Sequence, residues 1–337
     1  MKKKCNFYKK NELPPCISLK TNKYKNLQEF LLNNNSSEKS LSFIQEINCI
    51  KVLNGGEFGI DIKNEECISC MSCLFSCPGN QIQLHNDLSL EAKCSSFNKD
   101  YENKITTETL DKLFKGTFIS FPEISLAKSH RKPNSFNDFT SYNETKNISI
   151  WGANVINYLI SGNITRVATE VNLNLRSRDR DGRIDIAALS DSKIFLAEAK
   201  TSFSSMMSEG RYIPQSLAYK EEADRINNIQ DDEKKIYNFL FVGGNESDLL
   251  PPNHKKCTSN TGNQSEDFYK KLEKYQLKFI SANALLSLGL LKIFKGNKYS
   301  LDNIVDMLFN DNYLGLLSSG FISNRDKEYK VDSLFIN

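Results

Sequence analysis

Apolar residues recur at regular intervals from about position 150 onward, and their spacing predicts an α/β arrangement. Helical spacing over Ile150–Ser161 predicts a helix. Three strand-like runs follow, over Arg166–Leu175, Arg183–Leu189 and Lys193–Ala199. The Asp181-Gly182 pair between the first two runs is a hairpin signal, so at least two of these strands are expected to be antiparallel.

A second helix and further strands continue this pattern. Apolar positions between Gln215 and Ile229 predict a helix, and the largely apolar run Ile236–Val242 predicts a strand buried on both faces. Residues 276–295 predict a strand and a helix that complete the layer, and residues 301–323 predict one or two closing helices. The order α-β-β-β-α-β therefore predicts an α/β fold with a mixed sheet.

The first 147 residues have a different character. Residues 95–147 are polar with little periodicity, which favours a partly ordered connector with a short helix near Thr106–Phe114. Eight of the nine cysteines precede residue 95. The chain is therefore expected to join a metal-bearing N-terminal part to a separate α/β domain.

Four of these cysteines have the spacing C-x2-C-x2-C-x3-C, and a proline follows the last of them: Cys67, Cys70, Cys73 and Cys77. This run resembles the cluster-binding motif of bacterial ferredoxins. Three thiolates stepped along one tight loop can each reach a different iron, and the proline stiffens the chain that leaves the loop. A zinc site or free thiols are the alternatives, although structural zinc sites usually bring two C-x2-C pairs separated by a longer spacer.

The resemblance also suggests which cysteines share a cluster. In two-cluster ferredoxins the fourth cysteine of a run ligates the other cluster, so the first three need a remote partner. Cys49, before a Gly-Gly turn and a strand-like run, occupies a suitable place, which gives one [4Fe–4S] cluster on Cys49, Cys67, Cys70 and Cys73. A second cluster on Cys77 with Cys5, Cys16 or Cys94 is left open, as is the reading of those three as ordinary thiols.

Composition limits the compartment and the partners. The chain has 337 residues, which favours about two domains. Lys and Arg number 44 against 41 for Asp and Glu, so the formal charge of +3 names no partner. No stretch is long and apolar enough for a membrane span, and the basic start lacks the apolar region of a secretory signal. We therefore expect a cytoplasmic protein, whose cysteines are thiols or metal ligands rather than disulfides.

Charged residues stand at particular places on the predicted strands. Asp185 lies early in the second strand, and Glu198 and Lys200 end the third, on one face because strand side chains alternate. If the hairpin is in register, Asp185 falls beside Glu198. Two converging carboxylates repel unless a cation lies between them, and hard oxygen ligands favour Mg²⁺. A neighbouring lysine can offset charge on phosphoryl oxygens. An exposed ion pair between Glu198 and Lys200 is the alternative.

Asp185, Glu198-x-Lys200 and the element order resemble the PD-(D/E)XK nuclease superfamily, over roughly residues 147–245. Gln215 and Tyr219 are similar to the Q-x3-Y motif of its RecB-like branch, although packing alone also explains this pair. The resemblance implies a restriction-endonuclease-like core and DNA as the partner. It also implies roles for particular residues: metal ligation by Glu170, Asp185, Glu198 and the Ala199 carbonyl, catalysis by Lys200, and substrate positioning by Gln215 and, less directly, Tyr219.

Two departures from that branch shape the expected function. The histidine often found in the leading helix is missing, and the ferredoxin-like cysteine run lies wholly before the core, whereas in the iron–sulfur exonucleases of that branch cluster cysteines bracket the core. We therefore expect a Mg²⁺-dependent restriction or anti-phage defence endonuclease, as a homodimer or in a larger defence complex. A RecB-like repair exonuclease is one alternative. The other is an iron–sulfur electron-transfer protein with a partner-binding C-terminal domain, although no G-x-G-x-x-G fingerprint is present.

The expected organisation has five parts. They are an N-terminal extension (1–45), a ferredoxin-like [4Fe–4S] domain (46–95), a connector (96–146), a PD-(D/E)XK nuclease domain (147–300) and a C-terminal helical segment (301–337). The arginine-rich turn over 176–183 is expected to be either a solvated hairpin or a contact for phosphates.

Overall fold

The fold is seen in a computed structural model of the whole chain. The structure describes residues 24, 26–32, 50–52, 60–62, 67, 70–76, 82–85, 90–92, 145–162, 165–173, 182–202, 212–230, 234–244, 246–249, 269–323 and 331–332. The short helix expected near 106–114 and the arginine-rich turn before Gly182 lie outside these residues.

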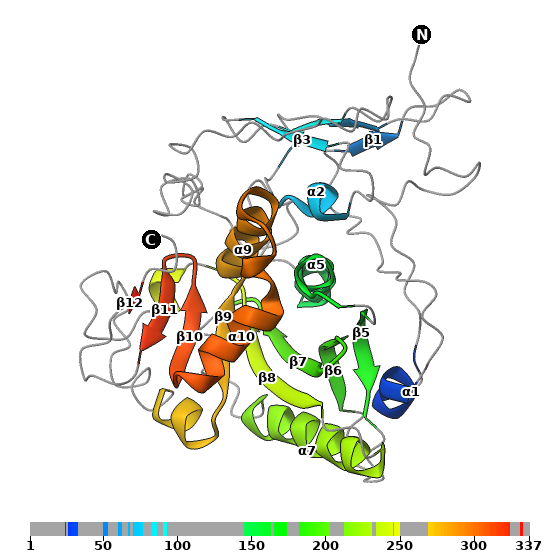
Figure 1. Cartoon of the computed structure of the whole chain (residues 1–337), viewed down its shortest axis with the longest axis vertical. Coiled ribbons are helices and arrows are strands. Elements are labelled where there is room, and N and C mark those ends of the chain that lie inside the picture. The colour runs from blue at the N-terminus through cyan, green and yellow to red at the C-terminus, as the bar shows by residue number, and fades with distance from the viewer. Residues whose placement is uncertain are drawn as a thin grey trace, which may run out of the picture.

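One mixed sheet organises the C-terminal half of the chain (Figure 1). Its strand order is β12-β11-β10-β9-β8-β7-β6-β5, in which β7, β8, β9 and β10 run parallel and the remaining neighbours pair antiparallel. The strands are β5 (Arg166–Asn172), β6 (Arg183–Leu189), β7 (Lys193–Lys200), β8 (Lys235–Val242), β9 (Lys278–Ser281), β10 (Tyr313–Leu317), β11 (Gly320–Ser323) and β12 (Val331–Asp332). The α/β class and the mixed sheet are thus confirmed.

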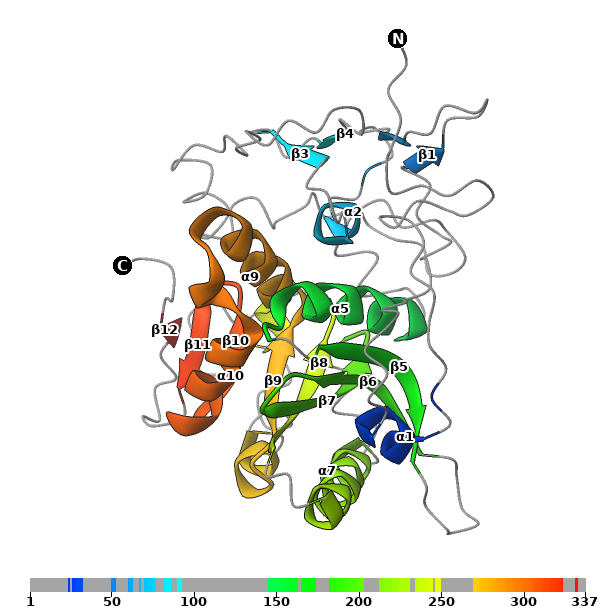
Figure 2. The same ribbon diagram turned by 45° about the vertical axis from the view of Figure 1, so that its right-hand side comes forward.

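Helices cover both faces of the sheet and form three layers (Figure 2). The helices α5 (Thr145–Leu159), α9 (Ala282–Lys295) and α10 (Leu301–Asn310) bury apolar side chains on one face. The opposite face is covered by α7 (Tyr212–Gln230) together with the helical residues 269–274. The central strand β7 is buried along seven of its eight residues, as expected for a strand between two helical layers.

The N-terminal part contributes short elements that pack against this core. Helix α1 (Leu27–Leu32) lies on the α7 face, where Arg166 Nη1 donates to the Phe30 carbonyl at 2.9 Å. Helix α2 (Ser72–Ser76) packs on α5. Two antiparallel ribbons flank it in sequence, β1 (Ile50–Val52) with β2 (Ile60–Ile62) and β3 (Ile82–Leu84) with β4 (Leu90–Ala92).

Two expected boundaries are corrected by the structure. Residues 301–323 are not all helical, because only α10 is a helix and residues 313–323 form the hairpin β10–β11 of the main sheet. The Ser318-Ser319-Gly320 turn separates two short apolar runs whose periodicity does not distinguish strand from helix. The nuclease-domain limit at 300 and the helical segment 301–337 are therefore wrong, since the sheet continues to Asp332. Helix α1 likewise belongs to the core and not to a separate extension.

A partly buried ion pair joins the sheet to α10 at the start of β7. Lys193 Nζ lies 2.5 Å from Asp306 Oδ2 and donates to the Asp302 carbonyl at 2.8 Å, while the Tyr237 hydroxyl donates to Asp306 Oδ1. Burial raises the pKa of Asp306, but the hydrogen bonds from Lys193 and Tyr237 and the charge of Lys193 outweigh it, and the pKa is lowered overall.

Replacing Asp306 by asparagine is expected to lower the free energy of unfolding by about 1–2 kcal/mol at neutral pH, a value reduced for partial exposure. Because the folded-state pKa is depressed, the stabilisation is present above the unfolded value and is lost as the pH falls through the folded value. Urea unfolding should therefore separate the D306N variant from the wild type above about pH 5 and bring them together below about pH 3. An equal difference at both pH values would contradict this role. E221Q, at an exposed position of α7, is the control.

Candidate active site

The pairing of β6 with β7 ends at the residues that the sequence singles out. The ladder runs from Leu189↔Ile194 to Ile186↔Ala197, so the next position in register places Asp185 opposite Glu198. At that position the backbone pair is replaced by a side-chain contact, in which the Ala199 N–H donates to Asp185 Oδ2 at 2.8 Å. The expected hairpin register is therefore confirmed, and the two carboxylates come from adjacent strands where the strands stop pairing.

The strands that carry Glu170 and Asp185, β5 and β6, change the direction of their side chains at these residues. Ile184 packs in the cluster beneath α7, whereas Ile186 packs in the cluster beneath α5, although regular alternation would place them on one face. Glu170 of β5 lies opposite Asp185, between the pairs Thr169↔Ile186 and Val171↔Ile184. Its φ of 54° is left-handed, a conformation that costs a non-glycine residue about 1 kcal/mol or more. The irregular backbone is thus concentrated at Glu170 and Asp185.

Asp185 is held in an environment that disfavours its charge. Burial raises its pKa to about 7, the charge of Glu198 adds to this, and the Ala199 N–H together with Lys200 and Arg183 acts in the opposite direction. No described residue donates a hydrogen bond to the second oxygen, Oδ1. A carboxylate that is desolvated beside another carboxylate is a suitable ligand for a divalent cation, which would relieve both costs.

Glu198 is the most enclosed member of the group, with its side chain 4% exposed. Its Oε1 lies 3.1 Å from Lys200 Nζ, so Glu198 and Lys200 share one face of β7 as the alternation predicts. Its Oε2 accepts from the Tyr219 hydroxyl at 2.5 Å. The alternative of an exposed surface ion pair is wrong, because the Lys200 side chain is also only 16% exposed.

Helix α7 supports this carboxylate through a short polar chain. Gln215 Nε2 donates to the Tyr219 hydroxyl at 2.6 Å, and that hydroxyl lies within hydrogen-bonding reach of both Glu198 and the Arg183 carbonyl. A hydroxyl has one proton, so it donates to one of these acceptors at a time. Tyr219 is fully buried and contacts the acidic group, which differs from the expected position beside a substrate. Sequence spacing placed Gln215 and Tyr219 on one helical face but could not show which strand residue they meet.

The Ala199 carbonyl is directed toward the same edge of β7. The Gly243 N–H donates to the Lys200 carbonyl at 2.8 Å, so residue 200 bonds toward β8. Backbone groups of successive strand residues point to opposite edges. The N–H and carbonyl of Ala199 therefore both point toward β6, where the N–H meets Asp185. This direction is consistent with the expected role of the Ala199 carbonyl as a further ligand.

The side chain of Glu170 pairs with Arg183 and not with Asp185, Glu198 or Lys200 in the described structure. Its Oε1 lies 3.7 Å from Arg183 Nη1, and both side chains are substantially exposed. Within the described residues, no three His, Cys, Asp or Glu side chains lie close enough together to hold a metal ion. The structure thus brings together Asp185, Glu198, Lys200 and Gln215, whereas the role of Glu170 as a ligand stays a prediction.

The cysteine run forms a second polar centre on the other face of the sheet. Cys67, Cys70 and Cys73 are not in disulfides, and Cys70 and Cys73 are buried. Burial raises the pKa of Cys70 to about 12, the Ser72 N–H opposes this by a hydrogen bond to the thiol, and nearby Cys67 adds to it. Met71 has a φ of 57°, which turns the backbone sharply between Cys70 and Ser72. Cys49 and Cys77 lie outside the described residues, as do Cys5, Cys16 and Cys94.

These features suit a cluster-binding loop. A cubane takes one thiolate per iron, so its cysteines do not need to meet at one point as they would around a single ion. The N–H of Ser72 points at the Cys70 sulfur, and hydrogen bonds to sulfur of this kind tune iron–sulfur sites.

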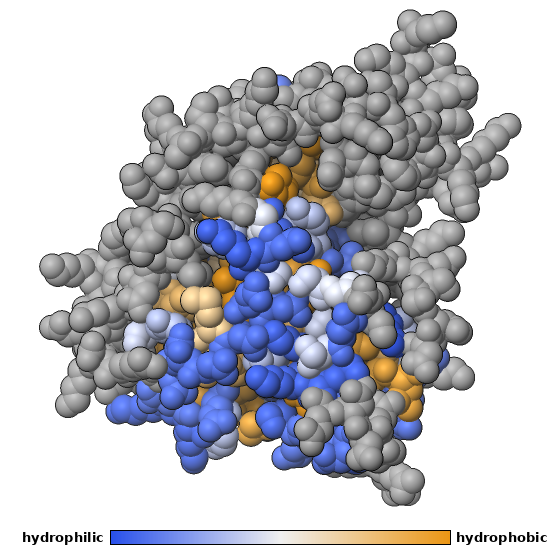
Figure 3. Space-filling view, viewed as in Figure 1, coloured by the Kyte–Doolittle hydropathy of each residue, from blue (hydrophilic) through white to orange (hydrophobic). Residues whose placement is uncertain are grey.

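Comparisons with protein-family models, with curated proteins and with solved structures find no match to this chain. In the part of the chain that the structure describes, no helix combines the length and apolar character needed to cross a bilayer. Hydrophilic side chains cover most of the described surface seen in Figure 3.

Replacing Tyr219 by phenylalanine should weaken the acidic group without unfolding the protein. The ring is retained, but Glu198 loses a hydrogen-bond donor and Gln215 loses an acceptor. We expect a divalent cation to bind the acidic group about tenfold more weakly than in the wild type. A titration with Mn²⁺, followed by electron paramagnetic resonance, checks this, with Y212F on the same helix as the control. An unchanged affinity would show that Tyr219 only fills space.

Proposed function

We propose that the protein is a Mg²⁺-dependent deoxyribonuclease of the PD-(D/E)XK type that carries an iron–sulfur cluster on its N-terminal cysteines. The observation that carries the proposal is the meeting of Asp185, Glu198 and Lys200 where the β6–β7 ladder ends. Two acidic residues and one lysine, which come from the adjacent strands β6 and β7, form a set suited to metal-assisted hydrolysis of a phosphodiester.

The protein groups divide the work of such a reaction. Asp185, Glu198 and the Ala199 carbonyl would hold Mg²⁺, which lowers the pKa of a bound water and offsets charge on the phosphate. The Lys200 ammonium, fixed by Glu198, provides a positive charge for the phosphoryl oxygens as negative charge develops on them. Tyr219 and Gln215 keep Glu198 in place from beneath. Arg183 lies two residues before Asp185, and its exposed side chain is available to a DNA phosphate.

The position of the site on the sheet also supports this function. Lys200 lies at the carboxyl end of β7, where the sheet changes from antiparallel to parallel pairing. Ligands of open α/β sheets bind outside the carboxyl ends of strands at a change of direction. The element order α5-β5-β6-β7-α7-β8 equals the order expected of a restriction-endonuclease-like core.

Cleavage should depend on pH through the Asp185 carboxyl. Because burial and Glu198 raise its pKa to about 7, the group is protonated below that value and must lose a proton to bind a cation. At low Mg²⁺ we expect the rate to increase as the pH rises through about 7. A higher Mg²⁺ concentration should move this increase to lower pH, since the metal competes with the proton. A pH profile that ignores the Mg²⁺ concentration would argue against Asp185 as a ligand.

The proposal is tested by digesting supercoiled plasmid and linear duplex DNA under anaerobic conditions, with Mg²⁺ and with a chelator of divalent ions. Hydrolysis that requires Mg²⁺ is the expected result. Nicking or linearisation of the plasmid would support a restriction or defence endonuclease, and cleavage of linear DNA alone would support a repair exonuclease. Absence of hydrolysis on both substrates would overturn the proposal and favour the electron-transfer alternative.

A further inference from the structure

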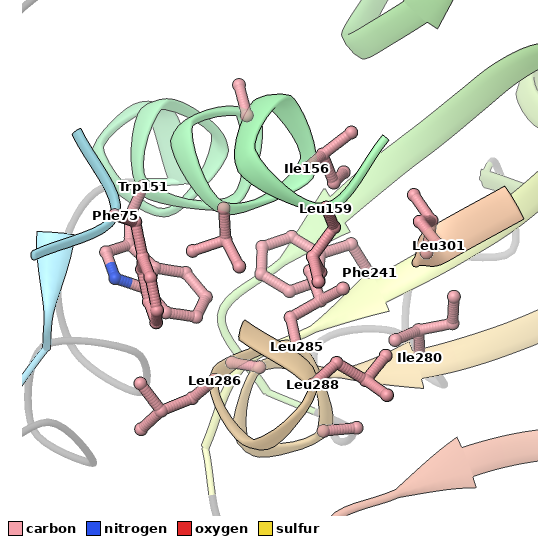
Figure 4. Packing of buried hydrophobic residues seen from close by; sticks show 14 of the residues in the cluster. Phe75, Trp151, Ile156, Leu159, Phe241, Ile280, Leu285, Leu286, Leu288 and Leu301 are labelled. Atoms are coloured by element: carbon pink, nitrogen blue, oxygen red, sulfur yellow. The ribbon is translucent and has the colours of Figure 1, made fainter. Parts of the chain in front are cut away.

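The cysteine loop is packed firmly onto the helical layer above the sheet. Phe75 of α2 stacks on Tyr158 of α5 with ring centroids 5.4 Å apart. On the other side it meets α9 at Gly289, where a Cβ atom would lie 2.6 Å from the Phe75 ring. Figure 4 shows Phe75 and Trp151 side by side at one end of the apolar cluster between α5 and α9. Only a glycine at position 289 allows the ring to approach this closely.

One hydrogen bond ties the loop to α5 at a cysteine. Trp151 Nε1 donates to the Cys70 carbonyl at 2.9 Å, in a buried environment and across 81 positions of sequence. Trp151 is the single tryptophan of the chain and is fully buried. The bond fixes the peptide immediately before Met71, whose left-handed backbone turns the loop. The indole therefore sets the direction in which the loop presents Cys70.

The same indole continues toward the proposed active site. Trp151 stacks on Phe241 with ring centroids 6.1 Å apart. The adjacent Gly152 lies so close to the Phe241 ring that a Cβ atom at position 152 would be 2.7 Å from it. Phe241 pairs with Ala199 in the β7–β8 ladder, beside Glu198 and Lys200. A continuous line of contacts thus runs from the Cys70 backbone through Trp151 to the strand that carries the acidic residues.

We propose that Trp151 is a positioning residue for the cysteine site and makes metal binding there and folding of the α5–sheet core one linked equilibrium. A ligand that binds only the folded loop stabilises every element whose packing the loop requires. Loss of the metal would weaken, without abolishing, the packing of the loop on α5 through Phe75 and the Cys70 carbonyl. This inference rests on the cluster of the proposed function, but its tests measure metal retention and stability and do not depend on DNA hydrolysis.

The test uses the full chain, purified without oxygen and loaded with iron and sulfide. The W151F variant retains an aromatic ring against Phe241 but lacks the N–H donor. It should release iron to a strong ferrous chelator about tenfold faster than the wild type, since a buried hydrogen bond is lost. The increase in melting temperature on loading should also be at least about halved in W151F. Y158F, which keeps its ring on Phe75 and leaves Cys70 untouched, is the matched control and should behave as the wild type.

A second measurement needs no variant. Because Trp151 is the only tryptophan in the sequence, tryptophan fluorescence reports directly on the contact between α5 and the cysteine loop. Removal of iron from the wild type should change the emission of Trp151 and lower the melting temperature. The proposal is overturned if W151F keeps iron as the wild type does, if stripping leaves both the emission and the melting temperature unchanged, or if the chain binds no metal at these cysteines.

Discussion

Replacement of Lys200 by methionine is expected to lower Mg²⁺-dependent DNA cleavage by about 10²–10³-fold while the fold is retained. The variant keeps the length of the side chain but removes the charge that faces Glu198 at 3.1 Å and that, in the proposed reaction, would face the phosphoryl oxygens. Replacement of Asp185 by asparagine should be at least as severe, because it also removes a proposed metal ligand. Initial rates on supercoiled plasmid at saturating Mg²⁺ measure both effects.

The matched control is K220M, which removes an exposed lysine of α7 that pairs only with Asp224 of the same helix in the described structure. Its cleavage rate should remain within about twofold of the wild type. The visible absorbance of an iron–sulfur cluster should be the same in K200M, D185N and the wild type, because the cysteines lie on the other face of the sheet. If K200M and D185N cut DNA as fast as K220M does, the site is wrongly assigned.

The second large effect concerns stability and the cysteine loop. Replacement of Phe75 by alanine should lower the free energy of unfolding by about 3–4 kcal/mol, the usual cost of truncating a buried aromatic ring. Phe75 is 6% exposed, and its ring lies between Tyr158 and Gly289, so that truncation would leave a cavity there. Denaturant unfolding of the metal-free protein gives this value without a contribution from the cluster.

The control for this variant is Y275A, which removes an aromatic ring that is 37% exposed. Its cost should stay below about 1 kcal/mol. Equal costs for F75A and Y275A would mean that α2 is not docked in solution as the structure places it. F75A should also retain less iron than the wild type, because the loop that carries Cys70 and Cys73 loses its anchor.

The sequence permitted prediction of the local elements and of part of the site. Alternation along β6 and β7 and the short polar turn over Ser190–Ser192 between them are sufficient to place Asp185 opposite Glu198, because register in a hairpin is set by side-chain alternation and the turn. The spacing of Glu198 and Lys200 likewise fixed their common face. Strand register and the shared face of Glu198 and Lys200 depend on residues close in sequence, so the periodicity of the sequence predicts them.

Other features depend on contacts between distant segments, which periodicity does not record. The hydrogen bond from Trp151 to Cys70 spans 81 positions, and nothing in either local pattern indicates it. The contact of Tyr219 with Glu198 requires the crossing of α7 over β7, which the Q-x3-Y spacing does not specify. The hairpin β10–β11 differs from the expected helix because a five-residue apolar run fits both structures. The left-handed backbone of Glu170 has no sequence signal at all, since the residue is not glycine.

Binding of Mn²⁺ to the purified protein, followed by electron paramagnetic resonance, tests most directly whether Asp185 and Glu198 share a divalent ion. The proposed site predicts about one bound Mn²⁺ per chain that Mg²⁺ displaces, with binding lost in D185N and retained in K220M. Equal binding of Mn²⁺ by the wild type and D185N, or no binding by either, would contradict the proposed active site.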